Sequence, residues 1–146
     1  MLKEVEIYTD GACSGNPGAG GWACILSYNG KEKEISGGEK ETTNNKMELT
    51  AIIKGLKALK EKCKVKVYSD SQYSVSAFLD GWIETWVKNG FKTANKKPVK
   101  NEELWKELLN LTNYHEVEFI KVKGHSDNEK NNRCDELARK EISKLI

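Results

Sequence analysis

The 146-residue chain is short enough for one domain and long enough to bury a sizeable core. It carries 24 basic and 22 acidic residues, a formal net charge of +2, and no apolar run near the roughly 18 residues of a membrane span. Its four cysteines form neither a CxxC pair nor a zinc-finger spacing, and no signal-peptide core is present, so we expect one cytoplasmic domain over residues 1–146 with reduced thiols and no membrane association.

The N-terminal residues predict three antiparallel strands, over 4–9, 21–28 and 31–37. A glycine-rich loop is expected between the first two strands, and Asn29-Gly30 predicts a tight hairpin turn between the second and third. The first strand ends in Asp10, where burial penalises a charged carboxylate. A carboxylate in this position indicates either that Asp10 forms a turn or that it belongs to a charged site built with other residues.

A helix follows within residues 42–61, because apolar residues recur there at helical spacing and residues 43–45 are all plausible N-caps. The rest of the chain predicts a strand at 64–71, helices at 72–79, 81–90 and 102–111, a strand at 116–124 and a C-terminal helix. The order β-β-β-α-β-α-β-α is typical of an α/β mixed sheet with helices on both faces.

The basic residues are unevenly distributed along the chain. Residues 85–101 contain five lysines and no acidic residue, whereas the rest holds 19 basic and 22 acidic residues, a net charge of −3. Local positive charge of this kind favours binding to a polyanion. Trp82, Trp86 and Phe91 lie among these lysines, and we expect Trp82 and Trp86 to be partly buried.

Four acidic residues are expected to meet at one end of the sheet. Asp10 and Asp70 each end a predicted strand, where ligand sites in α/β sheets gather. Glu48 lies on the stripe of its helix that faces the sheet, and Asp135 lies near the start of the last helix. Crowded carboxylates repel one another unless a cation neutralises them, and an all-oxygen set favours Mg²⁺, with Mn²⁺ as a substitute.

Each of these acids also has a purely structural interpretation. Asp10 could form an Asx-turn, and Asp70 could cap the following helix. Glu48 could close a capping box at the start of its helix, and Asp135 could pair with Arg139 four residues later. The convergence of all four favours the metal site.

Five segments, in order along nearly the full chain, resemble the type-1 ribonuclease H family: "YTDGACSGNPG", "TTNNKMEL", "VYSDSQY", "KVKGH" and "RCDELAR". The resemblance implies the ribonuclease H-like fold, with a five-stranded mixed sheet of three antiparallel and then two parallel strands. It implies an endonuclease that hydrolyses the RNA strand of RNA/DNA hybrids with two metal ions, leaving 5′-phosphate and 3′-hydroxyl ends.

The resemblance also implies roles for individual residues. Asp10, Glu48, Asp70 and Asp135 are the expected catalytic metal ligands, and His125 is expected to assist at the leaving group or in product release. Asp10 is the expected bridging ligand; Glu48 and Asp70 would complete one metal site and Asp135 the other. By contrast, His115 is expected to be an ordinary surface residue.

Substrate contacts are expected from polar residues beside the acids and from the basic segment. The first group could read 2′-hydroxyls of RNA or hold a DNA phosphate: Cys13, Ser14, Gly15, Asn16, Thr43, Asn44, Asn45 and Gln72. In the second group, Lys88, Lys96 and Lys97 could neutralise phosphates of the DNA strand, and Trp82 is expected to contact the substrate beside them. At the position of Glu41, some relatives have a basic residue near the DNA phosphate. Lys40 or Lys46 could supply that phosphate contact instead.

Two other classes of function fit part of this pattern. A non-catalytic nucleic-acid-binding module would lack at least one of the four acids, and all four are present. A metal-dependent DNA nuclease or resolvase would share the acids, but the "SGNPG" and "TTNN" segments suit 2′-hydroxyls instead. We therefore expect a monomer that binds an RNA/DNA hybrid; the sequence leaves open whether a single-strand-binding protein is also a partner.

Overall fold

The computed structural model describes residues 2–93, 96–123 and 128–146. The strands are β1 (Lys3–Cys13), β2 (Gly18–Tyr28), β3 (Lys31–Thr42), β4 (Cys63–Ser69) and β5 (Glu116–Lys121). The helices are α1 (Asn44–Lys57), α2 (Gln72–Leu79), α3 (Trp82–Lys88), α4 (Glu102–Tyr114) and α5 (Glu129–Ser143). None of the helices in these ranges is long and apolar enough to cross a membrane.

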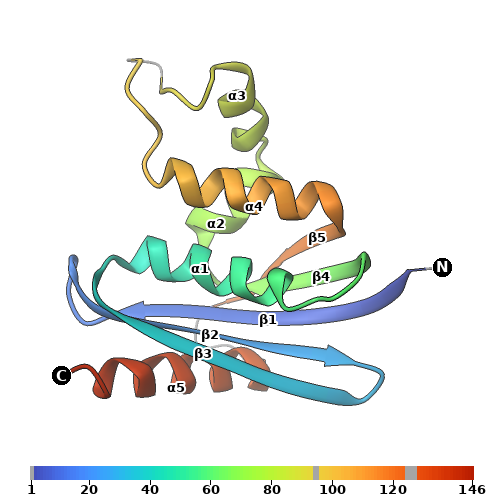
Figure 1. The fold of residues 1–146 in the computed structure, drawn as a ribbon, viewed down its shortest axis with the longest axis vertical. Helices are drawn as coiled ribbons and strands as arrows, with labels where there is room; N and C mark the ends of the chain where they lie inside the picture. The colour runs from blue at the N-terminus through green and yellow to red at the C-terminus, as the bar shows by residue number, and fades with distance from the viewer. Residues whose placement is uncertain (1, 94–95, 124–127) are drawn as a thin grey trace.

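The strands form one mixed sheet in the order β3-β2-β1-β4-β5 (Figure 1). β1, β2 and β3 pair antiparallel, whereas β4 pairs parallel with both β1 and β5. The turn between β2 and β3 has positive φ angles at Asn29 (51°) and Gly30 (81°), as an Asn-Gly hairpin turn requires. The expected five-stranded sheet is confirmed.

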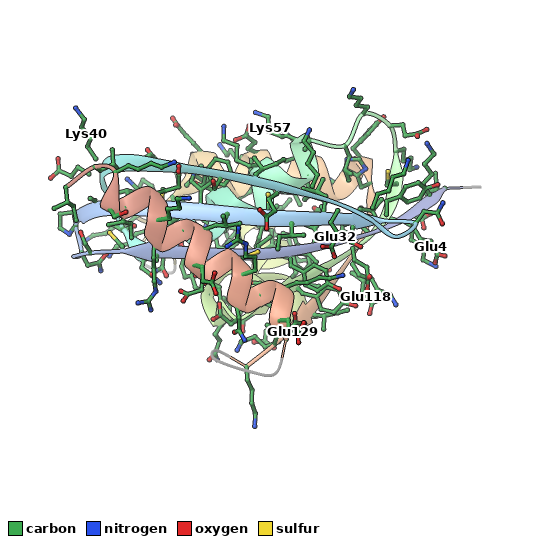
Figure 2. All side chains as sticks on the ribbon, turned by 90° about the horizontal axis from the view of Figure 1, so that it is seen from below. Glu4, Glu32, Lys40, Lys57, Glu118 and Glu129 are labelled. Carbon is green, nitrogen blue, oxygen red and sulfur yellow. The ribbon has the colours of Figure 1, made fainter. Side chains whose placement is uncertain are left out.

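Helices cover both faces of the sheet. α1, α2 and α4 lie on one face, and α5 crosses the other, as Figures 1 and 2 show. Leu56 of α1 and Trp105 of α4 are fully buried in the main core, whereas Cys134 and Ala138 of α5 pack against Tyr8 in a second cluster. α3 lies farther from the sheet than α2 and α4 and leads into the basic segment (Figure 1).

The predicted boundary of the first strand was wrong. β1 continues past Asp10 to Cys13, with Gly11 opposite Trp22 and Ala12 opposite Gly21, so only residues 14–17 connect it to β2. Asp10 therefore lies inside a strand and not at its end. Small residues on both strands allow this ladder to continue where glycines indicated a loop.

The other four strands also differ in extent from the prediction. β2 begins at Gly18 instead of residue 21, and β4 covers Cys63–Ser69 instead of 64–71. β3 continues to Thr42. Within it, Gly37 lies beneath the Trp22 indole, where a Cβ would come within 2.7 Å of the ring. β5 ends at Lys121 instead of residue 124.

The expectation for His115 was also wrong, because this side chain is buried, with 4% of its surface exposed. Its Nδ1 accepts a hydrogen bond from the Cys63 backbone N–H at 3.1 Å, which joins the end of α4 to the start of β4. Burial lowers the pKa of the imidazole. His115 is thus a structural residue.

Gly11 allows α1 to approach β1 at the point where the site is built. A Cβ on this residue would lie 2.5 Å from the backbone nitrogen of Glu48, and real side chains do not come that close. The obstacle is helix backbone, so it cannot be relieved by a change of rotamer. Gly11 therefore sets the separation of β1 from the first turns of α1.

We expect Gly11→Ala to push α1 away from β1, lowering the free energy of unfolding by about 2 kcal/mol or more through overpacking. Gly30→Ala is the matched control, since no atom lies within 4 Å of a Cβ there and only its positive φ is strained. Urea denaturation of both variants checks this. Equal stability losses would contradict the assigned close approach.

Candidate active site

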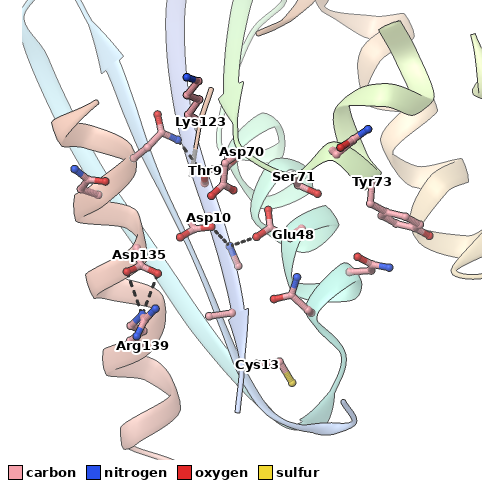
Figure 3. A pocket seen from close by; sticks show the side chains of 17 residues that line it. Thr9, Asp10, Cys13, Glu48, Asp70, Ser71, Tyr73, Lys123, Asp135 and Arg139 are labelled. Carbon is pink, nitrogen blue, oxygen red and sulfur yellow. Dashed lines mark hydrogen bonds and ion pairs between the residues drawn. The ribbon is translucent and has the colours of Figure 1, made fainter. Parts of the chain in front are cut away.

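One open pocket lies where β1 passes the end of β4, between α1 and α5 (Figure 3). Its walls come from segments distant in sequence, and 17 residues line it. They are Thr9, Asp10, Gly11, Ala12, Cys13, Asn44, Asn45, Glu48, Asp70, Ser71, Gln72, Tyr73, Lys123, Asn131, Asn132, Asp135 and Arg139. All four predicted acids are in this set.

Three of the acids form a tight cluster. Asp10, Glu48 and Asp70 each offer a carboxylate oxygen, and these oxygens all lie within 4.8 Å of one another. Asp10 and Glu48 are buried, with 8% and 5% of their surfaces exposed. The Gly11 backbone N–H donates to both Asp10 Oδ1 (3.0 Å) and Glu48 Oε1 (3.1 Å), so one donor holds the two carboxylates side by side.

The cluster is electrostatically unfavourable when all its carboxyl groups are ionised. Burial, followed by the charge of Asp70, raises the pKa of Asp10 to about 7. Burial, followed by the charge of Asp10, raises the pKa of Glu48 well above its ordinary value. Glu48 Oε2 is buried and has no hydrogen-bond partner among the described residues. An oxygen in that position has its lone pairs free for a cation.

Asp135 lines the same pocket from α5 but lies outside the tight cluster. Its carboxylate forms an ion pair with Arg139 at 3.1 Å, one turn along the helix, as Figure 3 shows. The structural interpretation of Asp135 is therefore observed, and so is its position beside the other acids.

The structural interpretations of Glu48 and Asp70 are not observed. The N-cap of α1 is Thr43, whose hydroxyl accepts from the Lys46 N–H, and the carboxylate of Glu48 points to Gly11. The N-cap of α2 is Ser71, so Asp70 does not occupy that position.

The predicted polar contacts surround the acids. Cys13, Asn44, Asn45 and Gln72 line the pocket, and the exposed loop of residues 14–17 adjoins it. Asn16 Oδ1 in this loop accepts a hydrogen bond from the Asn44 N–H at 3.4 Å, which ties the loop to the start of α1. Ser14 and Gly15 lie in the same loop, and Thr43 is committed to capping α1.

The predicted basic contacts lie apart from the pocket. Trp82 begins α3 and is 43% exposed, Lys88 ends it, and Lys96 and Lys97 are exposed in the connection to α4. Trp86 packs edge-on against the buried Trp105, with ring centroids 5.1 Å apart. The segment is therefore anchored by one tryptophan and exposes the other.

The predicted residue His125 lies outside the described residues. Lys123 and Asn131 line the pocket but were not among the predicted site residues. Lys123 follows β5, which runs parallel to β4, and the ends of parallel strands reach one edge of a sheet. Because β4 leads to Asp70, the residues that follow β5 could have been expected near Asp70, and Lys123 is one of them. Asn131, one turn before Asp135 on α5, would have followed from helical spacing.

Comparisons with known proteins agree with this geometry. The sequence profile of the RNase H family matches residues 2–143. Ribonuclease H of Acetivibrio thermocellus is 64% identical over 143 residues, which cover 98% of this chain and 97% of that protein. Ribonuclease H of Caldanaerobacter subterraneus subsp. tengcongensis is 63% identical over 142 residues, covering 97% and 93%.

Solved structures show the same fold. LC9-RNase H1, a type 1 RNase H with the type 2 active-site motif, matches with a TM-score of 0.88 and 27% identity over 100% of this chain and 75% of that one. LC11-RNase H1 in complex with an RNA/DNA hybrid matches with a TM-score of 0.72 and 27% identity over 96% and 97%. The family match, the relatives and the fold agree, and the chain belongs to the ribonuclease H family.

Proposed function

We propose that this protein is a Mg²⁺-dependent endonuclease that hydrolyses the RNA strand of RNA/DNA hybrids. The observation that carries the proposal is the buried cluster of Asp10, Glu48 and Asp70, with one Glu48 oxygen left without a partner. Family membership supports the same activity, and a solved relative is described in complex with an RNA/DNA hybrid.

The residues of the pocket fit a hard divalent cation. The clustered donors are all carboxylate oxygens, the kind of ligand that Mg²⁺ and Mn²⁺ prefer, and the raised pKa of Asp10 shows how unfavourable its negative charge is without a counter-charge. Asp10, Glu48 and Asp70 would hold one ion, and Asp10 and Asp135 a second. Bound Mg²⁺ would lower the pKa of a water molecule and stabilise charge on the departing oxygen.

The chain's own residues hold and orient the reacting groups. The Gly11 N–H fixes the carboxylates of Asp10 and Glu48, so that little reorganisation is needed when the substrate binds. Water attacks the phosphorus atom and the bond to the 3′-oxygen breaks, which leaves a 5′-phosphate and a 3′-hydroxyl. His125 is the proposed proton donor to the leaving oxygen or an aid to product release.

Recognition of RNA is assigned to the polar groups around the cluster. The 2′-hydroxyl both donates and accepts hydrogen bonds, and amide side chains such as those of Asn44, Asn45 and Gln72 can do the same. The 14–17 loop brings backbone groups to the same rim, through its contact with the start of α1. DNA phosphates would meet Thr43 and the exposed basic segment with Trp82.

Strand-specific cleavage tests the proposed activity directly. An RNA/DNA hybrid, an RNA duplex and a DNA duplex, each labelled on either strand, are incubated with Mg²⁺ or EDTA. We expect cleavage of the RNA strand of the hybrid alone, only with Mg²⁺, and a loss of about 10³-fold or more in Asp10→Asn. Cleavage of the DNA duplex, or equal cleavage in EDTA, would refute the proposal.

The raised pKa of Asp10 predicts how stability depends on pH. Between its ordinary value of 3.8 and about 7, the folded protein keeps a proton that the unfolded chain has lost, so the free energy of unfolding falls as the pH rises. In EDTA at pH 8, Asp10→Asn should therefore be more stable than the parent by about 4 kcal/mol, and the difference should shrink toward pH 4.

Asp80→Asn is the control for that comparison, since Asp80 is exposed at the end of α2. Thermal unfolding from pH 4 to 8 measures the effect. A parent protein at least as stable as Asp10→Asn at pH 8 in EDTA would contradict the assigned burial of charge.

The basic segment should contribute mainly to affinity. Replacing Lys96, Lys97 and Lys100 with Gln should weaken hybrid binding and reduce the slope of log K against log salt by up to about 0.9 per lost phosphate contact, with maximal turnover less affected. The matched control replaces Lys60, Lys62 and Lys64 with Gln, because these lysines lie near the start of β4, at the other end of the strand from Asp70. Equal slopes for the two triple variants would rule out this contact.

A further inference from the structure

The amide of Asn131 joins two strands of the sheet to α5. The side chain is 8% exposed, and its Nδ2 donates to the backbone oxygens of Thr9 at 3.2 Å and of Tyr68 at 3.1 Å. Thr9 directly precedes Asp10, and Tyr68 lies two residues before Asp70. One side chain therefore holds the backbone just before two of the clustered acids.

These contacts lie where the pairing of the two strands stops. The parallel register of β1 and β4 ends at Tyr8 opposite Tyr68, although β1 continues through Asp10 to Cys13. At this point the Asn131 amide links the two strands, beside a direct hydrogen bond from the Thr9 hydroxyl to the Tyr68 carbonyl oxygen at 3.3 Å. Carbonyl oxygens accept only, so the NH₂ group must face them, and Asn131 Oδ1 has no partner among the described residues.

Asn131 also shares a helix face with the fourth acid. Asp135 follows four residues later, which places both side chains on the same side of α5, and both line the pocket. The Asn131 backbone N–H donates to the side chain of Asn128, the N-cap of α5, at 3.2 Å. The first turn of α5 is thus fixed to β1 and β4 through Asn131.

We propose that Asn131 is a positioning residue that sets the separation of Asp10, Asp70 and Asp135 and thereby the affinity of the site for Mg²⁺. The inference rests on the proposed metal centre. Asn131 acts on each acid through backbone: on Asp10 and Asp70 through the carbonyls that precede them, and on Asp135 through the helix that carries it. Groups that orient metal ligands in this way commonly change metal affinity by about 10–100-fold when they are removed.

Asn131→Leu removes both N–H donors of the amide and keeps a similar side-chain volume. Asn131→Ala is the second variant, and it leaves room for water to reach the carbonyls of Thr9 and Tyr68. Leu137→Ala is the matched control, because Leu137 lies on the same helix and packs against the second core cluster, but its side chain has no hydrogen-bond donor for either carbonyl. All are titrated with Mg²⁺ without nucleic acid. The Gly11 amide resonance is the readout, since its N–H lies between Asp10 and Glu48.

We expect both Asn131 variants to bind Mg²⁺ at least about tenfold more weakly than the parent, and Leu137→Ala to bind it as the parent does. Parental affinity in either folded Asn131 variant would overturn the inference and leave the metal centre standing. A loss as large in Leu137→Ala would also overturn it, because any loosening of α5 would then suffice. A parent that binds no Mg²⁺ would refute both the metal centre and the inference.

Discussion

A single backbone N–H, that of Gly11, faces two buried carboxylates that would otherwise repel each other, and the geometry of the site depends on it. The contact exists because α1 lies so close to β1 that no side chain fits at this position. Asp10 and Glu48 thereby share one donor, at 3.0 and 3.1 Å, while burial keeps their charges unfavourable. The fold thus holds negative charge where only a bound cation would stabilise it fully.

The rest of the architecture brings two further acids to this point, one from the end of a neighbouring strand and one from the helix on the far face of the sheet. Asp70 follows β4, the parallel neighbour of β1, and Asp135 comes from α5 on the opposite face to α1. Asp135 is paired with Arg139, so its carboxylate already has a positive partner. The three clustered acids therefore carry most of the electrostatic strain, and the fourth is held nearby.

The sequence predicted the sheet, the two helical layers and the acids, because their signals are local: periodicity, an Asn-Gly turn, and carboxylates at strand and helix positions. The prediction was wrong where a contact between residues distant in the chain determines the local structure. Gly11 indicated a loop, but its pairing with Trp22 of β2 places it in a strand. His115 indicated a surface residue, but Cys63, more than fifty residues away, supplies its partner. Helical spacing from Asp135 could have placed Asn131 in the pocket, but its contacts with Thr9 and Tyr68, which are still more distant in the chain, have no local signal.

The metal site can be tested by anomalous scattering, which would locate the ions in crystals of the protein grown with Mn²⁺ and a hybrid oligonucleotide. We expect an anomalous peak bounded by the carboxylates of Asp10, Glu48 and Asp70, within coordination distance of the Glu48 oxygen that has no partner among the described residues. A second peak should lie between Asp10 and Asp135. Manganese bound only elsewhere, with the three carboxylates unchanged and ion-free, would contradict the proposed metal site.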